Sequence, residues 1–417
     1  MRGLSRVFGA LVLVGAVVAV VVWQRPEVTP PASAVLKDVV VQYADGSPLW
    51  SSADGGPKSP LVAQVLDEVR LQGSLDLDGL RRSGATVVTT IDRKAQAAGT
   101  AAIDAVAPGQ PQSLRYALTA VDPATGGVLA YVPSARGAQS SQGPDATDYA
   151  GGVLRQPGAA IFPVTVVAAL QQGQSLDGVF DGRSPRTLGG VQVRDEVACG
   201  ERCTLRDALA KSSNVVLYDL IVNQIGTEQV RTAGLQAGVP KTVVLDGEEH
   251  ELLTGVDGGV PNAGIGIGVD DAAMRPLDLA TVYATFAAGG VRHRTHFVSE
   301  VSSEDGSPLY QAAQSPEAAF DQDVARSREI ASQVTTVLRD STRCPGAVCR
   351  DAAYEFPAGD VRGLHTHAWT AGYTDRMAIT VLVTGEDPAQ PASVASGRPV
   401  GQAGLPNAIW QEFRKQA

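Results

Sequence analysis

The chain opens with an apolar segment that differs from everything after it. Residues 7–23 are an uninterrupted run of apolar residues and glycine, preceded by Arg2 and Arg6 and followed by a polar tripeptide at 24–26. Spanning the hydrocarbon core of a bilayer takes about 20 residues, so this run suits a short transmembrane helix. Because positive charges collect on the cytoplasmic side of such helices, the pattern predicts a cytoplasmic tail at residues 1–6 and an exported body.

A cleaved signal peptide is the alternative for this segment. Residues 32–34, Ala-Ser-Ala, have the small-residue pattern of a cleavage site, but they lie far from the apolar run. We therefore expect an uncleaved anchor at residues 7–23, followed by a linker at residues 24–60 in which Pro, Gly and Ser are frequent. Under both alternatives the body of the chain is exported.

Beyond residue 60, helical and strand patterns follow one another in an order that predicts an α+β fold. From Leu61 to Val69 apolar residues recur with helical spacing, and residues 118–121 and 128–132 are short apolar strands joined by a turn. A late strand is expected at residues 378–383. Strands at both ends with helices between them are typical of α+β proteins rather than of alternating βαβ units. Further helical patterns lie at residues 162–171, 205–211, 215–225, 277–288 and 409–415.

Composition and charge exclude two classes of protein. The chain has 417 residues, of which 44 % are hydrophobic and 19 % charged, so it can bury a sizeable core and global disorder is excluded. Its formal net charge is −10 and its sequence pI is about 5.1. An acidic chain without a basic tract is a poor binder of nucleic acid, and we predict no nucleic-acid partner.

The four cysteines fit an exported protein. Cys199 and Cys203 are spaced C-x3-C, and Cys344 and Cys349 are spaced C-x4-C. An even number of cysteines outside the cytoplasm predicts disulfides, and two local pairs are favoured among the three possible connectivities. A zinc site is the alternative, but neither spacing is C-x2-C and no histidine stands beside either pair.

Other polar groups are expected to lie at the surface. The histidines at 293 and 296 and those at 365 and 367 are spaced as pairs, but no carboxylate or cysteine cluster accompanies them. We therefore predict that they are surface residues, that the chain holds no metal and that it needs no cofactor. The acidic doublet Asp270-Asp271 is expected to belong to a solvated loop.

Six segments in a fixed order carry a resemblance to a known family. They resemble the transpeptidase half of penicillin-binding proteins, most of all the bifunctional type without its glycosyltransferase domain. Together they span most of the chain after Leu61, so the resemblance rests on ordered segments and not on one short pattern. The segments are VVTTIDRKAQAAGTAAI, LTAVDPATGGVLAYV, LRDALAKSSNVVLYDL, IGIGVDDAAMRPLDLATVYATFAAGG, HAWTAGYTDRMAITVLV and GLPNAIWQEF.

This resemblance implies a specific architecture. It implies a five-stranded antiparallel sheet with flanking helices beside an all-α lobe, with the active site of the family in the cleft between them. We accordingly expect a short N-terminal pedestal or linker region at residues 61–112 and the transpeptidase-like domain at residues 113–417. The single transmembrane helix would precede both.

The first of the family's three motifs has lost its chemistry in this chain. The family writes it P-G-S-x-x-K-P, where the serine is the nucleophile and the lysine one turn later takes part in proton transfer. The matching segment at residues 157–163 has Ala159 in place of the serine and Phe162 in place of the lysine. No S-x-x-K occurs elsewhere in the chain, so a shifted alignment does not restore the motif.

The other two motifs differ in how far they are retained. The second, S-x-N, is intact at Ser212 to Asn214, and the resemblance implies a substrate-binding role for Ser212 and Asn214. With the nucleophile absent, the favoured alternative is that both residues cap helix ends. The third, K-[ST]-G, is matched best by residues 358–362, where Asp360 replaces the cation that recognises a carboxylate in the family. A negative charge at this position would repel such a ligand.

These observations predict a pseudo-transpeptidase of the cell membrane. We expect a single-pass protein, anchored by its N-terminal helix, that serves as a non-catalytic scaffold or regulator in peptidoglycan synthesis. Its partner would be peptidoglycan itself, a cell-wall synthase or a division protein. One alternative is an active D,D-transpeptidase or carboxypeptidase that binds penicillin through a displaced serine, Ser212 or Ser213. Another is a reversible sensor of muropeptides or β-lactams.

Overall fold

The structure, a computed structural model, describes residues 36–133, 147–341, 347–355 and 365–417. Backbone contacts divide the chain into two units, Met1–Lys37 and Asp38–Ala417. The predicted tail and anchor in the first unit lie outside the described residues. Within the described ranges, the helices are too short or too polar to cross a bilayer.

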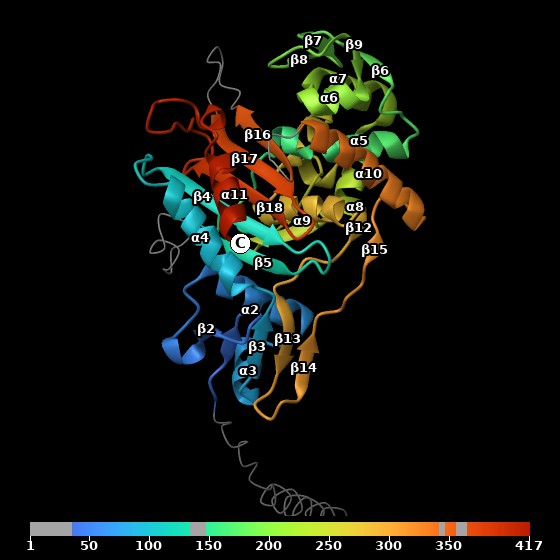
Figure 1. Ribbon diagram of the computed structural model, residues 1–417. Coiled ribbons are helices and arrows are strands. Elements are labelled where there is room, and N and C mark those ends of the chain that lie inside the picture. Colours follow the sequence, from blue (N-terminus) through green and yellow to red (C-terminus); the bar gives the residue numbers. More distant parts are fainter. Residues whose placement is uncertain (1–35, 134–146, 342–346, 356–364) are drawn as a thin grey trace, which may run out of the picture. The chain divides into compact units, whose positions relative to one another are not determined.

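A five-stranded sheet near the start of the second unit joins distant parts of the chain. Its order is β14-β13-β3-β1-β2, and β1 pairs in parallel with β3 while its other pairs are antiparallel. The segment from Val40 onward, within the expected linker, thus contributes strands to this sheet. The strands are β1 (Val40–Gln42), β2 (Pro48–Ser51), β3 (Thr86–Thr89), β13 (Val298–Ser302) and β14 (Pro308–Gln311), with helices α2 (Pro60–Gln72) and α3 (Leu77–Ser83) beside them (Figure 1).

A second five-stranded sheet forms the centre of the unit and is antiparallel throughout, as predicted. The predicted hairpin is β4–β5 and the predicted late strand is β18, while the expected terminal helix is α11. The order is β16 (Val348–Glu355), β17 (His365–Tyr373), β18 (Ala378–Gly385), β4 (Leu114–Val121) and β5 (Val128–Val132).

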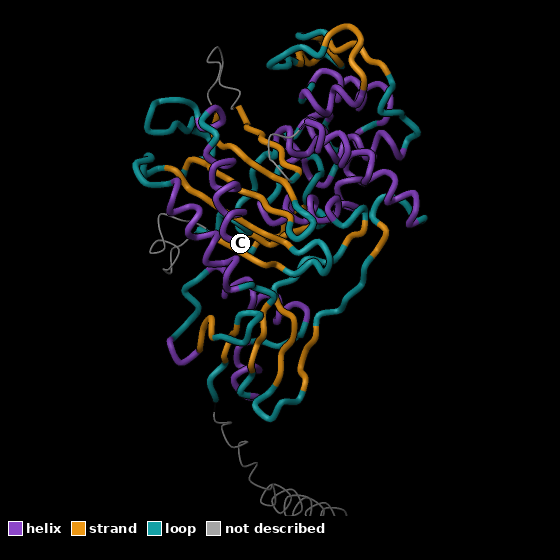
Figure 2. The backbone as a smooth tube through the Cα atoms, in the orientation of Figure 1, coloured by secondary structure: helices purple, strands orange, loops and turns teal. Residues whose placement is uncertain are grey.

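Helices cover both faces of this central sheet. Helices α4 (Arg93–Val106) and α11 (Leu405–Gln416) pack together on one face, and α9 (Pro276–Ala287) packs against β4, β17 and β18 (Figures 1 and 2). Side chains alternate accordingly along β4, where Leu118 belongs to the core under α4 and α11, and Ala117 to the core on the opposite face. Because both faces are covered, every residue of β18 is buried.

The rest of the unit is a largely helical lobe, but it is not all-α as expected. Among the described residues, three two-stranded ribbons interrupt the helices. The sequence did not predict them because strands of three to five residues are too short to show a clear alternation. The helices are α5 (Phe162–Gln171), α6 (Leu205–Lys211), α7 (Asn214–Leu220), α8 (Thr227–Ala237) and α10 (Val324–Ser341). The ribbons pair β6 (Val179–Gly182) with β9 (Gly200–Thr204), β7 (Arg186–Leu188) with β8 (Val191–Val193), and β10 (Thr242–Leu245) with β11 (Glu248–Glu251).

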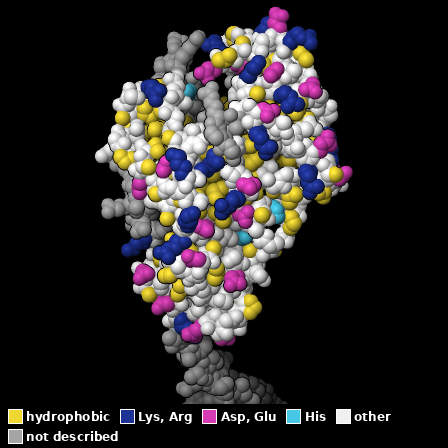
Figure 3. All heavy atoms as spheres, in the orientation of Figure 1, with side chains coloured by type: hydrophobic (Ala, Val, Ile, Leu, Met, Phe, Trp, Pro, Cys, Tyr) yellow, Lys and Arg dark blue, Asp and Glu magenta, His cyan; other side chains and the backbone are white. Residues whose placement is uncertain are grey.

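Shorter elements complete the unit. Strands β12 (Val291–Arg292) and β15 (Glu317–Ala318) form a small ribbon, and Ile221–Ile225 is a π-helical turn after α7. On the face seen in Figure 3, positive and negative side chains are interspersed. Single 3-10 turns lie at Ser52–Asp54, Gly158–Ile161, Val256–Gly258, Ala263–Ile267, Asp270–Ala272 and Val400–Gln402.

One of the two predicted disulfides is confirmed. Cys199, just before β9, and Cys203, within it, are disulfide-bonded, with their Cα atoms 5.5 Å apart. Cys349 is also disulfide-bonded, but its predicted partner Cys344 lies outside the described residues. Within the described part of the chain, no three His, Cys, Asp or Glu side chains converge in a way that could hold a metal ion.

Glu68 links helix α2 to strand β13 through its carboxylate. Its oxygens accept hydrogen bonds from the backbone N–H groups of Phe297, at 2.6 Å, and of Val298, at 3.4 Å. Burial raises the pKa of Glu68 to about 7, although these hydrogen bonds and the charge of Arg294 act in the opposite direction. The folded protein therefore holds a proton at Glu68 in a pH range where the unfolded chain has lost it.

We predict that this linkage makes the protein less stable as the pH rises from about 4.5 to 7. Between the unfolded pKa of about 4.5 and the folded pKa of about 7, the unfolded chain gives up the Glu68 proton while the folded protein keeps the carboxyl neutral. The free energy of unfolding therefore falls over this pH range, by about 1–3 kcal/mol in total. Urea unfolding between pH 4.5 and 8 measures this loss. Glu68→Gln should flatten the slope, whereas Glu300→Gln, at an exposed position of β13, should not. Equal slopes in Glu68→Gln and the wild type would contradict the assignment.

Candidate functional site

The segment that holds the altered first motif is fixed at its start by two side chains of the central sheet. The carbonyl oxygen of Gln156 accepts hydrogen bonds from Trp369 Nε1, at 2.9 Å, and from His367 Nε2, at 2.8 Å. Since a carbonyl can only accept, Nε2 of His367 carries a proton, and its Nδ1 accepts from the hydroxyl of Thr366 at 2.8 Å. Burial lowers the pKa of His367 to about 4, so the imidazole is neutral.

His367 is therefore not the surface residue that the sequence predicted. Its side chain is 1 % exposed, because β17 lies inside the sheet between β16 and β18. The expectation was wrong because alternation in a strand covered on both faces does not separate buried from exposed positions. His367 and Trp369 together hold the backbone just before Ala159 against the sheet.

A glycine loop holds the same segment from the side of the lobe. The backbone N–H of Gly158 donates to the carbonyl of Gly268 at 3.0 Å. Gly268 has a φ of +78°, and a Cβ atom there would lie 2.1 Å from the carbonyl oxygen of Gly158. Only glycine allows this approach at a positive φ. The loop thus fixes the position of the turn Gly158–Ile161.

The two altered positions of the first motif face different surroundings. Ala159 is partly exposed, and its methyl group offers neither a nucleophile nor a hydrogen bond. Phe162, at the first residue of α5, is 0 % exposed. The guanidinium of Arg350 lies over its ring, with Cζ 5.3 Å from the ring centroid. A methyl group and an aromatic ring therefore occupy the two positions that the sequence matched to the first motif.

Arg350 is the principal residue of this site that the sequence reasoning missed. It projects from β16 and is 7 % exposed. Its Nε donates to the carbonyl of Ala159 at 2.7 Å, and its Nη2 donates to the carbonyl of Leu209 and to Ser212 Oγ, both at 2.8 Å. Burial lowers the pKa of Arg350, and no described carboxylate pairs with it. The guanidinium thus joins the central sheet to the turn of the first motif and to helix α6.

The residues that the sequence matched to the third motif, 358–362, are not among those that the structure describes. Asp360 and its neighbours lie outside the described residues. Strand β16 ends at Glu355 and pairs with β17, with Ala352 opposite Trp369. It therefore precedes the Trp369 strand in the sheet and brings a cation, Arg350, to the turn Gly158–Ile161. In the sequence, Arg350 could have been recognised as a candidate because it is a basic residue in the β-rich run before Trp369.

The S-x-N segment is divided between two helices. Ser212 ends α6 with a φ of +60°, and its hydroxyl accepts the hydrogen bond from Arg350. The side-chain cap of α7 is Ser213, whose Oγ accepts from the N–H of Val216 at 3.2 Å and donates to Asp195 Oδ2 at 2.7 Å. Asn214 is the first residue of α7, and its amide donates to the carbonyl of Arg194 at 3.1 Å.

This arrangement has a defined chemical capacity. The structure brings Ala159, Phe162 and Ser212 together around Arg350, while the amide of Asn214 is directed toward Arg194. The guanidinium remains protonated and cannot act as a base toward the hydroxyl of Ser212. Ser213 does contact a carboxylate, but it is 0 % exposed and out of reach of a substrate. Among the described residues of this site, no accessible hydroxyl is therefore paired with a base.

We predict that a lysine cannot be restored at position 162 without a large loss of stability. In Phe162→Lys the ammonium would be buried beside the positive charge of Arg350. Ser212 Oγ, which already accepts from Arg350, would not compensate it. The free energy of unfolding should therefore fall by about 3–5 kcal/mol. Phe162→Met keeps an apolar side chain but gives up the contact between the ring and Arg350, so it should lose only about 2 kcal/mol. Chemical denaturation of both variants tests this. A Phe162→Lys variant as stable as Phe162→Met would show that the pocket accommodates a second cation.

Comparison with curated proteins identifies relatives over most of the chain. It is 31 % identical over 363 residues to penicillin-binding protein 1A of Mycolicibacterium smegmatis and 32 % identical over 366 residues to penicillin-binding protein 1A of Mycobacterium tuberculosis. Each alignment covers 85 % of this chain but only 44 % and 42 % of the relative. The chain thus spans less than half the length of these two proteins.

Solved structures have the same fold. The penicillin-binding protein PonA1 of M. tuberculosis superposes with a TM-score of 0.72 at 30 % identity, over 85 % of this chain and 89 % of that one. The penicillin G acyl-enzyme complex of penicillin-binding protein A from M. tuberculosis gives a TM-score of 0.67 over 91 % and 99 % of the two chains. At 20 % identity, this second likeness concerns the fold alone.

The family assignment rests on a match of the domain itself. The family model of the penicillin binding protein transpeptidase domain matches residues 116–400. That range contains the central sheet from β4 to β18, the lobe and both altered positions of the first motif. The resemblance drawn from the sequence is confirmed, and the chain belongs to the penicillin-binding protein transpeptidase family.

Proposed function

We propose that this protein is a non-catalytic member of its family, a pseudo-transpeptidase that acts in peptidoglycan synthesis as a scaffold or regulator. The observation that carries the proposal is the pair Ala159 and Phe162 at the nucleophile and lysine positions. Loss of the nucleophile in a serine hydrolase costs about 10⁶ in turnover, because binding and the oxyanion site alone supply little of the rate. The exchange of the two reactive groups for apolar side chains favours stability over activity.

The surroundings of the remaining serines favour this role over catalysis through a displaced serine. The hydroxyl of Ser212 is bonded to Arg350, which takes up no proton, and Ser213 is buried against Asp195. A serine nucleophile needs an adjacent base and access to the substrate. Ser212 lacks an adjacent base, and Ser213 lacks access to the substrate.

The proposed setting is the outer face of the cell membrane. Residues 7–23 would anchor the chain in a single pass, and the body would reach peptidoglycan, a cell-wall synthase or a division protein. The two mycobacterial relatives are penicillin-binding proteins about twice as long as this chain. A chain without the nucleophile suits a role beside an active synthase.

We predict that the purified protein forms no covalent adduct with penicillin. A fluorescent penicillin should label it on a denaturing gel no more than it labels a heat-denatured sample, because Ala159 has no oxygen to acylate. Penicillin-binding protein A of M. tuberculosis, known as a penicillin G acyl-enzyme complex, serves as the positive control.

Mass spectrometry of the same samples gives the decisive reading. An adduct of one penicillin per chain would overturn the proposal, and the modified peptide would locate the displaced nucleophile. Saturable binding by calorimetry without an adduct would instead indicate the reversible sensor. The variant Ala159→Ser tests the altered position directly and should stay unlabelled, since no amine stands at position 162 to activate the hydroxyl.

The scaffold role predicts a specific partner. Affinity purification of the full chain from detergent-solubilised membranes, after mild cross-linking, should recover a peptidoglycan synthase or a division protein. The control is the same chain without residues 1–35, which removes the proposed anchor but leaves the described body intact. Recovery of neither class of protein, in cells that contain both, would contradict the scaffold role.

A further inference from the structure

One exposed surface of the helical lobe combines apolar side chains with negative charge. It consists of the ribbon β10–β11 and of the loop that follows it, residues 254–260, and we call it the ribbon surface. Among the described residues, three of the five most exposed large apolar side chains lie on it, Val244 at 64 %, Val256 at 87 % and Val260 at 70 %. Single exposed valines are ordinary, but several on one surface indicate a site of interaction.

The pairing of the ribbon places Val244 on its outer face. Val244 lies opposite Glu249, and Thr242 lies opposite Glu251. Directly opposed residues point to the same side of a ribbon, and successive residues alternate between its sides. The inner face includes Val243, which is buried in the main core. Because burial of Val243 decides which face turns inward, the valine and the two carboxylates of the outer face stay exposed.

Backbone hydrogen bonds hold the loop as a compact turn against the ribbon. The N–H of Gly255 donates to the carbonyl of Gly259 at 3.0 Å, and the 3-10 turn Val256–Gly258 lies between them. A Cβ atom on Gly258 would lie 3.0 Å from Glu251 Oε2, so the turn adjoins the outer face of β11. The loop and the outer face of the ribbon therefore form one continuous surface.

The carboxylates of the ribbon surface have no partners among the described residues. Residues 242–261 contain five acidic side chains and neither lysine nor arginine. All five are exposed, and none forms an ion pair or a hydrogen bond with another described residue. They are Asp246, Glu248, Glu249, Glu251 and Asp257.

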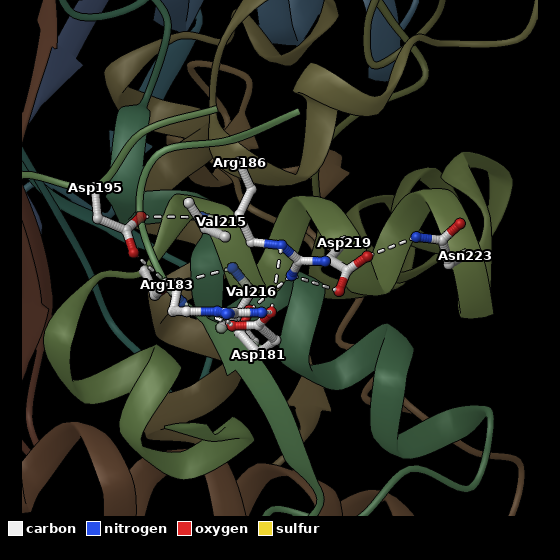
Figure 4. A network of polar contacts seen from close by, with 9 residues as sticks. Asp181, Arg183, Arg186, Asp195, Val215, Val216, Asp219 and Asn223 are labelled. Atoms are coloured by element: carbon white, nitrogen blue, oxygen red, sulfur yellow. Dashed lines mark hydrogen bonds and ion pairs between the residues drawn. The ribbon is translucent and has the colours of Figure 1, made fainter. Parts of the chain in front are cut away.

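Elsewhere in the lobe, acidic side chains are paired with arginine. In the network that joins β6 and β7 to helix α7, Asp181 pairs with Arg183 at 2.6 Å and Asp219 pairs with Arg186 at 3.0 Å (Figure 4). Such pairs offset the mutual repulsion of neighbouring carboxylates. The ribbon surface lacks this compensation within the described part of the chain, so a positively charged partner would relieve its repulsion.

Charge and apolar character together define the chemistry of the partner. Anionic lipids and nucleic acids would be repelled by the carboxylates. A second copy of this chain has a formal net charge of −10 and would be repelled in the same way. A free polyamine would match the carboxylates but would leave the valines in water. A protein segment that carries lysine or arginine beside aliphatic side chains matches both features.

We propose that the ribbon surface docks a positively charged, partly apolar segment of a second protein. Aliphatic side chains of that segment cover Val244, Val256 and Val260, and its lysines or arginines pair with the surrounding carboxylates. The inference rests on the scaffold role proposed above, because it names the surface at which the partner binds and the chemistry of that partner. The ribbon surface contains no residue of the three motif segments, so docking there does not require the turn at Ala159.

Site-specific photo-cross-linking of the full chain, in the cells that produce it, tests the surface. The photoreactive residue p-benzoylphenylalanine replaces Val244 or Val256, and in the control it replaces Val324, which is exposed on α10 outside the ribbon surface. We expect about tenfold more adduct from positions 244 and 256 than from 324, because a docked segment stays within reach of the reactive group. Mass spectrometry should place the adduct in a segment of a second protein with a net positive charge.

Removal of charge from the ribbon separates docking from simple exposure. Single exposed ion pairs contribute little, so the ribbon variant removes three charges together. It combines Glu248→Gln, Glu249→Gln and Glu251→Gln. With p-benzoylphenylalanine at position 256, this variant should form about tenfold less adduct, since the partner loses its charge pairs while the valines stay in place.

A matched control variant removes the same number of charges elsewhere. It changes three carboxylates that are exposed outside the ribbon surface, and its adduct yield at position 256 should equal that of the wild type. The control combines Asp78→Asn, Glu300→Gln and Asp375→Asn. Thermal unfolding of both variants should follow that of the wild type, which shows that a change in adduct does not come from loss of the fold.

Each other outcome overturns the inference. Adduct at positions 244 and 256 no stronger than at 324, adduct on a lipid, on an acidic segment or on a second copy of this chain, or a full yield in the ribbon variant would each contradict it. Affinity purification distinguishes this failure from that of the proposed function. A synthase or division protein still recovered with the ribbon variant would retain the scaffold role and refute this surface, whereas recovery of neither with the wild type would contradict the scaffold role itself.

Discussion

The contact between Arg350 and Phe162 is the interaction on which the centre of this protein depends. The guanidinium comes from a strand of the central sheet, and the ring comes from the first residue of a helix in the lobe. The same guanidinium binds the carbonyls of Ala159 and Leu209 and the hydroxyl of Ser212. One side chain thus connects the sheet, the altered first motif and the S-x-N segment across the cleft.

A buried guanidinium without a carboxylate needs compensation, and the surroundings supply it. Removing a cation from water costs several kcal/mol even after the protein relaxes. Two backbone carbonyls, a hydroxyl and the face of an aromatic ring offset this cost, and a desolvated cation–π contact alone contributes about 2 kcal/mol. Arginine suits such a site better than lysine because its guanidinium is more weakly hydrated and its donors spread in a plane. The site is therefore stabilised by interactions that contribute nothing to acyl transfer.

Further hydrogen bonds fix the backbone just before Ala159. Trp369 and His367 hold the carbonyl of Gln156, and Gly268 holds the backbone at Gly158. These contacts orient the turn before Ala159 as firmly as a nucleophile would require. Under the proposed role, a turn that is fixed in place without a nucleophile suits binding or regulation, because such a role uses the shape of the lobe and not its reactivity.

The sequence by itself determined the family, the α+β class, the order of the main elements, the Cys199–Cys203 pair and the two altered positions, because each depends on local patterns or on residue identity. It did not reveal Arg350 or the burial of His367. Those depend on which strand lies beside which and on how loops far apart in the chain close on one another. Hydrophobic periodicity identifies an element and its buried face, but a covered strand such as β17 has no exposed face, and a charge such as Arg350 acquires its partners only when the sheet and the lobe pack together.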